Sequence, residues 1–350
     1  MVSEVVAMTR ERGIGQGRRY DVVVVGGGPA GLNGALMLGR ARRSVLVIDS
    51  GEPRNAPSAH MHGFLSRDGV PPGRLLEAGR REVTGYGGEI ISGRARSASR
   101  EAGEFVVELD TGARVRARRL LVTTGLTDEL PDVPGLAARW GRDVLHCPYC
   151  HGWEFRDQPI GVLYTGERSV HQALLFRQWT EQLTLFLHTG PGLTGEEAER
   201  LAARGIAVVT GEVAEVETAD DRLTGVRLHT GELVPLRAVA VVPRAVPRAG
   251  VLASLGLRPV PAPHGVGEYV AADPTGLTTV PGVWVAGNVS APAATVLVAA
   301  ASGATAAGAI NADLVDEDTH RAVLRHRDPF SHESESVLCA QVMGGRRHGL

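Results

Sequence analysis

The sequence predicts an α/β protein of two domains, with the second domain inserted into the first. A continuous apolar stretch, residues 20–25, runs into a glycine-rich turn and a helical pattern. A second alternation of strands and helices begins near residue 159. A last apolar strand, residues 283–286, precedes a long Ala-rich helix, so we expect the chain to return to its first domain there. With 350 residues and 43% hydrophobic content, the chain can bury two ordinary cores.

The first unit has the order of a dinucleotide-binding βαβ motif. Residues 20–25 are a strand of the type that is buried on both faces, and residues 44–48 are the next strand. A helix over residues 32–42 connects them, and the turn before it is Gly-Gly-Gly-Pro-Ala-Gly, residues 26–31. The free N–H groups at the start of such a helix face the phosphates of a bound nucleotide.

Each glycine of this turn has a separate physical role. Gly26 permits the tight turn, Gly28 lets the backbone approach a pyrophosphate, and Gly31 lets helix and strand pack closely. Asp49 ends the second strand, where its carboxylate can accept hydrogen bonds from a ribose 2′-hydroxyl. Strand, helix and terminal acid together make the motif far more specific than a glycine-rich turn alone.

The second unit predicts a smaller α/β domain. Residues 194–197, Thr-Gly-Glu-Glu, have the spacing of a capping box and open a helix that ends at Arg204. The other expected elements are strands over 159–164, 183–188, 206–210, 222–229 and 233–242, and a helix over 169–180. We therefore expect a discontinuous first domain, residues 20–126 and 247–315, with residues 127–246 inserted. Residues 1–19 and 316–350 are charged and without periodicity, and we predict that both tails are disordered.

Composition and charge exclude several function classes. A net charge of −2 and a pI near 6.6 provide no basic surface for nucleic acid. Residues 1–19 lack the apolar core of a secretory signal. Residues 293–312 are apolar, but they are mostly Ala and Gly and contain Ser302, Thr305 and Asn311, which favours a buried helix over a membrane span. We expect a soluble cytoplasmic protein with no nucleic-acid or membrane partner.

A Cys-Pro-Tyr-Cys sequence at residues 147–150 predicts redox chemistry. Two thiols two residues apart can close a disulfide ring and open it again, which moves two electrons. Only one other cysteine is present, Cys339, so a structural disulfide framework is not indicated. Pro148 suits the first position of a helix, which would put Cys147 at a helix N-terminus that stabilises its thiolate.

Other interpretations of this motif fit less well. The string is identical to the glutaredoxin motif, but that fold carries it near the start of a small domain without a preceding dinucleotide unit. With His151 it matches the CxxCH haem-attachment string, which requires export. A zinc site would need two more ligands, and His146 and His151 on one short segment rarely close a tetrahedron with the two cysteines. The redox pair remains the preferred interpretation.

The chain resembles the low-molecular-weight thioredoxin reductase family over residues 20–315. The motifs that carry the resemblance are the turn at 26–31, the Thr-Thr-Gly turn at 123–125, the central CxxC, and Gly287-Asn288 where the family usually has Gly-Asp. The resemblance implies a two-domain thioredoxin reductase-like fold with a Rossmann-like FAD domain, and a homodimer. The FAD-binding residues it implies are Gly26, Gly28, Pro29, Ala30, Gly31, Asp49, Ser50, Arg54, Asn55, Thr124, Gly125, Gly287, Asn288, Thr295 and Val296.

Within that family the redox motif is similar to a particular branch. Residues 147–152, Cys-Pro-Tyr-Cys-His-Gly, differ from the Cys-Ala-Thr-Cys-Asp-Gly of thioredoxin reductases. They resemble the enzymes that oxidise dithiols of small natural products, such as the holomycin and gliotoxin dithiol oxidases. Residues 60–65, His-Met-His-Gly-Phe-Leu, also resemble that branch.

The inserted domain departs from the reductases where they bind NADPH. Tyr164 replaces the glycine of the tight turn, and Glu167 adds negative charge near the phosphates. Residues 188–192, His-Thr-Gly-Pro-Gly, stand where the family has an arginine-rich motif for the 2′-phosphate. We expect a degenerate NAD(P)H-type domain that has kept its fold and lost its nucleotide. Electrons would then leave the flavin for another acceptor, most simply O2.

The resemblance also assigns roles at the redox centre. Cys150 corresponds to the flavin-proximal thiol and Cys147 to the interchange thiol that meets the substrate. His151 takes the place of the family's acid and could act as general acid and base, or be only a polar residue at the domain junction. His146, His60 and His62 could line the substrate pocket or lie at the surface.

Two further positions bear on the flavin site. Asn288 keeps a hydrogen-bond acceptor and adds donors, so we expect flavin binding to survive the change from aspartate. Residues 294–296, Ala-Thr-Val, stand where reductases have Arg-Gln-Ala, which leaves room for a compact organic substrate.

The sequence therefore predicts an FAD-dependent dithiol oxidase that acts on a small-molecule dithiol and gives H2O2 from O2. An NADPH- or ferredoxin-linked disulfide reductase and a non-enzymatic redox-sensing flavoprotein remain as alternatives.

Overall fold

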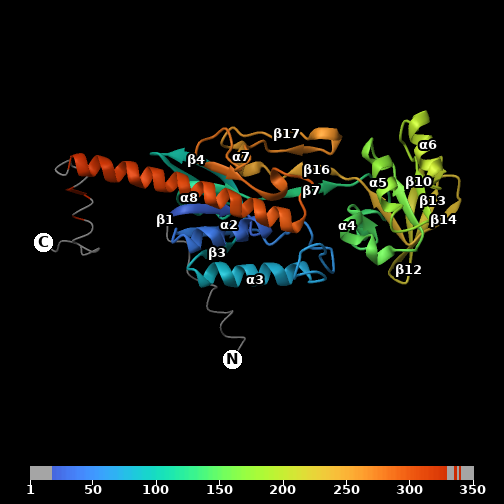
Figure 1. Ribbon diagram of the computed structural model, residues 1–350, viewed down its shortest axis with the longest axis horizontal. Coiled ribbons are helices and arrows are strands. Elements are labelled where there is room, and N and C mark those ends of the chain that lie inside the picture. The colour runs from blue at the N-terminus through green and yellow to red at the C-terminus, as the bar shows by residue number, and fades with distance from the viewer. Residues whose placement is uncertain (1–17, 329–334, 337–338, 340–350) are drawn as a thin grey trace, which may run out of the picture.

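The computed structural model describes residues 18–328, 335–336 and 339. The sequence predicted two disordered tails. Most residues of these tails, 1–17 and most positions beyond 328, lie outside the described residues. The described chain forms two bodies joined by a narrow two-stranded connection, and Figure 1 shows the resulting elongated shape.

The first body is built on a seven-stranded sheet. Its strand order is β3-β2-β1-β6-β5-β4, and β19 pairs with the second half of β6. Strands β1, β2, β3, β6 and β19 run parallel, while β4 and β5 form an antiparallel extension. The bounds are β1 Arg19–Val25, β2 Val45–Asp49, β3 Glu89–Ser92, β4 Ala95–Glu101, β5 Glu104–Leu109, β6 Arg114–Val122 and β19 Val283–Val285.

Both faces of this sheet are covered, which explains the unbroken apolar run of β1. Val22 and Val24 pack on one side with helices α2 (Pro29–Arg40) and α8 (Val296–Arg327), while Val23 and Val25 pack on the other side. Helices α2 and α8 approach closely because Gly34 and Gly303 meet at the contact, where a side chain on Gly303 would collide with the backbone of α2. The remaining elements of this body are α3 Pro72–Gly85, α7 Gly250–Ala253, β17 Val260–Pro261, β18 Glu268–Tyr269 and the short helices η3 Pro263–Gly265 and η4 Gly287–Val289.

The second body has a five-stranded parallel sheet of order β11-β10-β9-β15-β8 and a three-stranded antiparallel sheet of order β12-β13-β14. The predicted capping box is confirmed, since the Thr194 hydroxyl accepts from the Glu197 N–H and the Glu197 carboxylate accepts in return. The strands are β8 Val144–Leu145, β9 Ile160–Leu163, β10 Leu183–Phe186, β11 Ala207–Val209, β12 Val213–Ala219, β13 Arg222–Leu228, β14 Leu233–Pro235 and β15 Ala238–Val241, and the helices are η1 Ala137–Arg139, α4 Pro148–His151, η2 Trp153–Phe155, α5 Arg168–Phe176 and α6 Gly195–Ala203.

The sequence predicted a single strand over residues 233–242, and this prediction is wrong. The chain over residues 233–242 forms β14 and β15, which belong to different sheets. The break falls at Leu236 and Arg237, where the chain leaves the antiparallel sheet and enters the parallel one.

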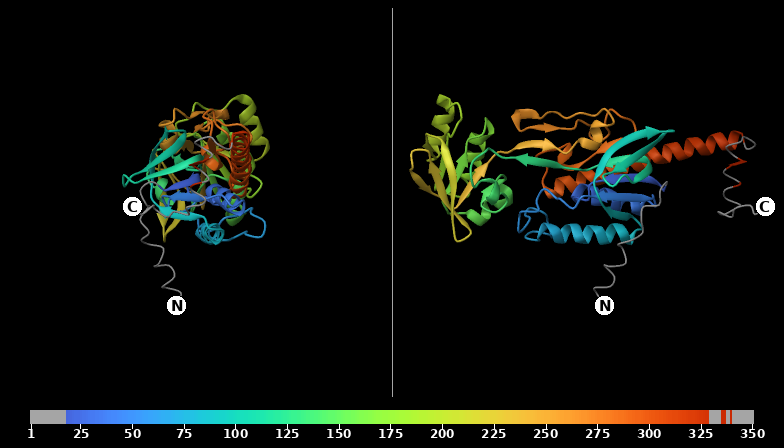
Figure 2. Two further views of the ribbon diagram at one scale, coloured as in Figure 1. Left: turned by 90° about the vertical axis from the view of Figure 1, so that its left-hand side faces the viewer. Right: turned by 180° about the vertical axis from the view of Figure 1, so that it is seen from behind.

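The chain crosses between the two bodies twice, through strands β7 (Leu126–Glu129) and β16 (Arg244–Pro247), which pair antiparallel. The two bodies lie at opposite ends of this ribbon, and the view from behind in Figure 2 shows the same separation. Segments far apart in the sequence therefore meet beside the ribbon, where the cavity described below lies.

The predicted disorder is wrong for residues 316–327, because α8 continues to Arg327. Two acidic residues of the predicted tail, Glu317 and Asp318, are ion-pair partners of the buried Arg118 and the partly buried Arg119 on β6. Arg118 contacts Asp21, Glu317 and Asp318, and Arg119 contacts Asp313 and Glu317. At the other end of the chain, Arg19 belongs to β1 and not to the predicted tail.

Helix α8 is also long enough and apolar enough to cross a membrane by length and composition alone. One such helix is weak support for a span, because the core helix of a soluble protein has the same properties. The sequence predicted a buried helix, and one face of α8 is buried, where Gly303, Ala306, Ile310 and Leu314 pack into the first body.

Candidate active site

A single large cavity joins the glycine-rich turn after β1 to the cysteine pair at the start of α4. Its volume is about 840 Å³. All the residues predicted for cofactor binding and catalysis line this cavity, except Gly31. They are Gly26, Gly28, Pro29, Ala30, Asp49, Ser50, Arg54, Asn55, Thr124, Gly125, Cys147, Cys150, His151, Gly287, Asn288, Thr295 and Val296. His60, His62 and His146 line the same cavity. Gly31 lies behind the turn, where a side chain would collide with the Gly26 carbonyl and the Thr123 hydroxyl.

The turn has the form of a dinucleotide cradle. Gly26 has a φ of +112°, a region open to glycine, and its N–H donates to the Ile48 carbonyl at 2.8 Å. Helix α2 starts at Pro29 with Gly28 as its N-cap, and the space beside Gly28 is open. A pyrophosphate could therefore approach the backbone here and face the start of a twelve-residue helix.

The carboxylate of Asp49 lies beside this turn and is held from three directions. The N–H groups of Gly27 and Gly51 donate to its Oδ1 at 3.3 and 3.1 Å, and Arg80 donates to its Oδ2 at 2.8 Å. Arg80 comes from α3 and also lines the cavity. Sequence reasoning missed Arg80, because no motif links α3 to the turn. The cradle, the open glycine and the oriented acid fit a dinucleotide such as FAD.

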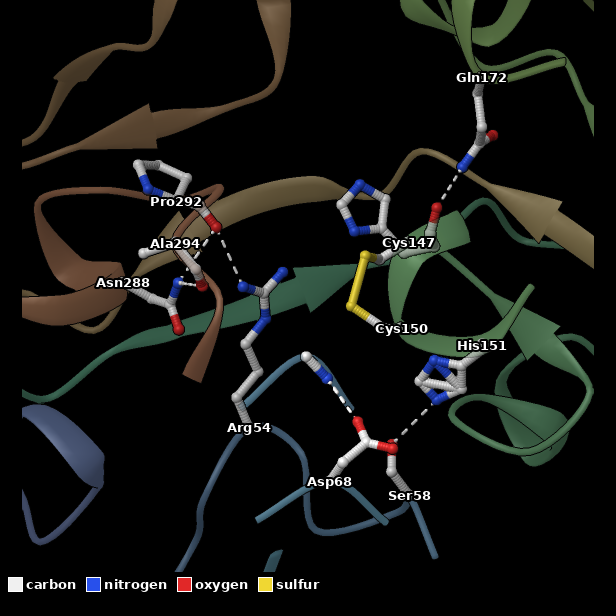
Figure 3. Close-up of a disulfide and its surroundings, with 12 residues drawn as sticks. Arg54, Ser58, Asp68, Cys147, Cys150, His151, Gln172, Asn288, Pro292 and Ala294 are labelled. Atoms are coloured by element: carbon white, nitrogen blue, oxygen red, sulfur yellow. Dashed lines mark hydrogen bonds between the residues drawn. A yellow bond between two sulfur atoms is a disulfide. The ribbon is translucent and has the colours of Figure 1, made fainter. Parts of the chain in front are cut away.

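The two cysteines form a disulfide in the structure, with Cys147 as the N-cap of α4. Their Cα atoms lie 5.3 Å apart. Gln172 on α5 braces the chain just before the pair, since its Nε2 donates to the His146 carbonyl at 2.6 Å and to the Val241 carbonyl at 3.2 Å. Figure 3 shows this brace above the disulfide. Sequence reasoning missed Gln172, whose contacts depend on how α5 packs against β15.

His151 follows the pair and points toward the segment after β2. Its Nε2 lies 3.5 Å from the Ser58 hydroxyl, as the dashed line in Figure 3 marks. Its Nδ1 is buried and has no hydrogen-bond partner among the described residues. Burial lowers the pKa of His151, with a smaller opposing effect from Glu154 and a further lowering by His62. The imidazole is therefore neutral near pH 7 and can accept a proton.

The other histidines at the cavity have different surroundings. Burial, with help from the Arg54 charge, lowers the pKa of His146 to about 4, so this ring is also neutral. His62 lies between two carboxylates, with its Nδ1 3.3 Å from Asp68 and its Nε2 3.4 Å from Glu154. Glu154 belongs to the second body, so His62 connects the two bodies at the cavity rim.

One side of the cavity is closed by the segment that leads into α8. Asn288 donates from Nδ2 to the carbonyls of Ala291, Pro292 and Ala294. Arg54 donates to the same Pro292 carbonyl, as Figure 3 shows. Thr295 is the N-cap of α8.

The equivalent of the reductases' nucleotide turn, in the second body, is narrowed by the buried ring of Tyr164. Tyr164 is only 7% exposed, and its ring contacts the position of Gly190, where a side chain would collide with it. Burial and the charges of Glu197 and Glu167 raise the pKa of its hydroxyl. The small cavity at this turn, about 290 Å³, is lined by Tyr164, Thr165, Gly166, Glu167, Thr189, Gly190 and Pro191, none of them basic.

Comparisons with known proteins agree with this geometry. Residues 20–308 match the pyridine nucleotide-disulphide oxidoreductase family. The chain is 30% identical over 316 residues to thioredoxin reductase sirT of Leptosphaeria maculans, which covers 85% of this chain and 95% of the relative. A probable thioredoxin reductase of Arthroderma benhamiae is 38% identical, but the match spans 157 residues, 43% of this chain and 39% of that protein.

Among solved structures, that of HlmI is similar with 50% identity and a TM-score of 0.84, covering 89% of this chain and 97% of the other. Members of the pyridine nucleotide-disulphide oxidoreductase family typically depend on a flavin. The chain belongs to this family, as a thioredoxin reductase-like disulfide oxidoreductase of the branch that contains the holomycin and gliotoxin dithiol oxidases.

Proposed function

We propose that the protein is an FAD-dependent dithiol oxidase that closes a disulfide in a small organic dithiol. The balanced reaction is R(SH)2 + O2 → RS2 + H2O2. The cradle at Gly26, Gly28 and Asp49 would hold the FAD, together with the hydrogen-bonding groups around Asn288. When bound, FAD supplies the two-electron acceptor that regenerates the protein disulfide and passes the electrons to O2.

The observation that carries this proposal is the turn of the second body, where the buried Tyr164 ring stands and the lining residues include no basic side chain. A reductase must seat NADPH there, and the 2′-phosphate needs basic partners. Tyr164 occupies the turn, and the charges around it are those of Glu167 and Glu197. A dianionic phosphate would be desolvated next to carboxylates, which is unfavourable. The disulfide, in contrast, faces the same cavity as the cradle. These features support a thiol substrate, and not NADPH, as the source of the electrons.

The protein's own residues then perform two thiol exchanges. A substrate thiolate attacks Sγ of Cys147, which breaks the Cys147–Cys150 bond and releases the Cys150 thiolate. The second substrate thiolate attacks the substrate sulfur of the mixed disulfide and releases Cys147. The two cysteines end as the reduced pair, and the substrate leaves as a disulfide.

His151 supplies the base for these exchanges. Its Nδ1 is buried, so the tautomer with the proton on Nδ1 leaves the lone pair on Nε2, 3.5 Å from the Ser58 hydroxyl that lines the cavity. Nε2 can take the proton of a substrate thiol, directly or through the Ser58 hydroxyl, and later return it to a leaving thiolate. The lowered pKa of His151 keeps this lone pair available at neutral pH.

Anaerobic mixing of the flavin-loaded protein with two reductants tests the proposal. Dithiothreitol should bleach the flavin absorbance, and NADPH should leave it unchanged. In air, dithiothreitol oxidation should consume one O2 and release one H2O2 for each disulfide formed. Rapid bleaching by NADPH would overturn the oxidase and restore a disulfide reductase.

We also propose that the protein acts as a homodimer in which α8 contributes to the contact. The solvent-facing side of α8 carries large apolar residues at both ends, namely Leu297, Val298, Val315, Val323 and Leu324. Burying such a surface against a second copy would remove it from water. Light scattering after size exclusion should give twice the chain mass of 36.9 kDa, and a mass of one chain would refute the dimer.

A further inference from the structure

We infer that Asn288 is a positioning residue, whose amide holds residues 291–294 in place as a wall of the cavity, and that an aspartate at this position would release that wall. This inference deepens the proposed function, on which its catalytic consequence rests. The structural part of the inference can be tested without any turnover.

The first argument is the donor count at Asn288. Its single amide nitrogen, Nδ2, lies 3.2 Å from the Ala291 carbonyl, 3.2 Å from the Pro292 carbonyl and 2.9 Å from the Ala294 carbonyl. Three carbonyl oxygens thus converge on one group with two hydrogens. A carboxylate can only accept hydrogen bonds, so an aspartate here would face three acceptors without a donor. The position therefore requires an amide.

The second argument is that one of these carbonyls is held from a second direction. Arg54 Nη1 donates to the Pro292 carbonyl at 3.0 Å. The guanidinium is itself fixed by two hydrogen bonds to Asp128 on β7, of 2.8 and 2.7 Å, and the Asp128 side chain is only 4% exposed. A bidentate pair of this kind leaves the guanidinium little freedom. The carbonyl of Pro292 is therefore clamped between Asn288 and Arg54, as Figure 3 shows.

The clamp matters because of where the segment lies. Pro292, Ala293 and Ala294 line the cavity, and the chain continues at once into Thr295, the N-cap of α8. Their side chains are small, so the backbone itself forms the wall. A shift of this backbone would change the space left for a substrate and the position of the α8 N-terminus together. The Asn288 Oδ1 has no donor among the described residues, so it remains an acceptor for a bound group.

Hydrogen exchange of the four amides in residues 291–295, those of Ala291, Ala293, Ala294 and Thr295, tests the clamp directly, in flavin-free and flavin-loaded protein. We expect Asn288→Asp to speed exchange about tenfold or more, because it removes the donor and adds repulsion. Asn288→Ala should speed it less, since it removes only the donor. Asn55→Asp is the matched control. It adds the same charge to the same cavity, and the structure gives it no hydrogen bond to this segment, so exchange over 291–295 should stay as in the wild type.

Two outcomes would decide against the inference. If residues 291–295 of Asn288→Asp exchange at the wild-type rate, Asn288 is not a clamp and serves only as an acceptor for the flavin. Equal acceleration in Asn55→Asp would show that cavity charge alone is responsible. If Asn288→Asp does not fold, Asn288→Ala and Arg54→Lys take its place, and both should speed exchange over the same segment.

The catalytic consequence has its own readout. In flavin-loaded Asn288→Ala, the KM for the dithiol should rise about tenfold, because the backbone wall beside the substrate space is displaced. If the wild-type protein oxidises no dithiol, the proposed function fails while the exchange result still decides the clamp. If dithiol is oxidised and exchange is unchanged, the clamp alone fails.

Discussion

At the scale of single residues, the proposed redox centre combines the Cys147–Cys150 disulfide with neutral imidazoles. Burial lowers the pKa of both His146 and His151. Neither ring then adds positive charge beside the cysteines near pH 7, and both can accept protons. Of the two, only His151 has a ring nitrogen that is buried and without a partner among the described residues. This leaves Nε2 of His151, 3.5 Å from the Ser58 hydroxyl that lines the cavity, as the ring nitrogen for the proposed proton transfer.

Replacement of each cysteine by serine should distinguish their roles. We expect Cys147→Ser to leave Cys150 as a thiolate beside the flavin, which produces a long-wavelength charge-transfer band. Cys150→Ser should lack this band, and both variants should lose turnover. Absorbance spectra of the two flavin-loaded variants check this. A band in Cys150→Ser alone would reverse the assignment of the flavin-proximal and interchange thiols.

Removal of the imidazole at position 151 should slow the reductive half-reaction. His151→Ala should retain flavin and disulfide, yet slow flavin bleaching by dithiol about 10²–10⁴-fold near neutral pH. The wild-type rate should fall only below the lowered pKa of His151, where the ring becomes protonated. The difference in bleaching rate between His151→Ala and the wild type should shrink as pH rises toward the substrate thiol pKa, because a pre-formed thiolate needs no base.

Stopped-flow bleaching across pH provides the measurement for this variant. His151→Asp should recover part of the rate, since a carboxylate can also accept a proton. Equal rates of wild type and His151→Ala at every pH would reduce the residue to a structural role.

At the scale of elements, α8 depends on charges that are distant in sequence. Arg118 is only 9% exposed and contacts Asp21, Glu317 and Asp318. Burial alone would raise the pKa of Glu317 and Asp318, but the guanidinium groups of Arg119, Arg118 and Arg43 outweigh it and hold both pKa values below the ordinary range. The part of α8 at residues 313–318 is therefore tied to β6 by ion pairs.

Arg118→Ala should lower the free energy of unfolding by about 1–3 kcal/mol at pH 7, because it leaves partly buried carboxylates without their partner. Carboxylates with a lowered folded pKa stabilise the fold above their unfolded pKa and lose that contribution as pH falls through the folded value. The wild type should therefore lose stability below about pH 4, and Arg118→Ala should lose less there.

Denaturant unfolding at pH 7 and pH 3 measures both effects. Arg321→Ala is the matched control, because Arg321 is 44% exposed and pairs with the same Glu317. Its effect should stay within about 0.5 kcal/mol. Equal losses in the two variants would contradict the special role of Arg118.

At the scale of the whole molecule, the segment between β2 and α3 ties the two bodies together beside the cavity. Arg54 pairs with Asp128 on the connecting ribbon, Ser58 lies near His151, and His62 lies near Glu154. These contacts hold the disulfide toward the cradle. Without a nucleotide to bring to the flavin, the proposed cycle needs no other arrangement of the two bodies.

Small-angle scattering should therefore give one profile for the oxidised protein, the dithiol-reduced protein and the protein mixed with NADPH. The double variant His62→Ala, Glu154→Ala should broaden the distribution of interatomic distances, because it removes one of these contacts. A large change of profile on reduction of the wild type would contradict a single arrangement.

Much of the fold could be predicted from local patterns. The β1–turn–α2–β2 unit, the capping box of α6 and the strand β19 lie within a few residues of their predicted places. Their signals are apolar periodicity and turn chemistry, which depend on neighbouring residues alone. The helical end of α8 was missed, because residues 316–327 carry a charge pattern that makes sense only opposite Arg118 and Arg119.

The sequence by itself determined the family, the redox pair and the glycine cradle, because each rests on residue types at short, fixed spacing. Only the tertiary structure brought Asn288 and Arg54 to one carbonyl, set Gln172 behind the cysteines and Arg80 against Asp49, and left Nδ1 of His151 without a partner among the described residues. These contacts join residues separated by up to 238 positions. Local propensity carries no information about such distances, since they are decided by how the elements of each body pack together.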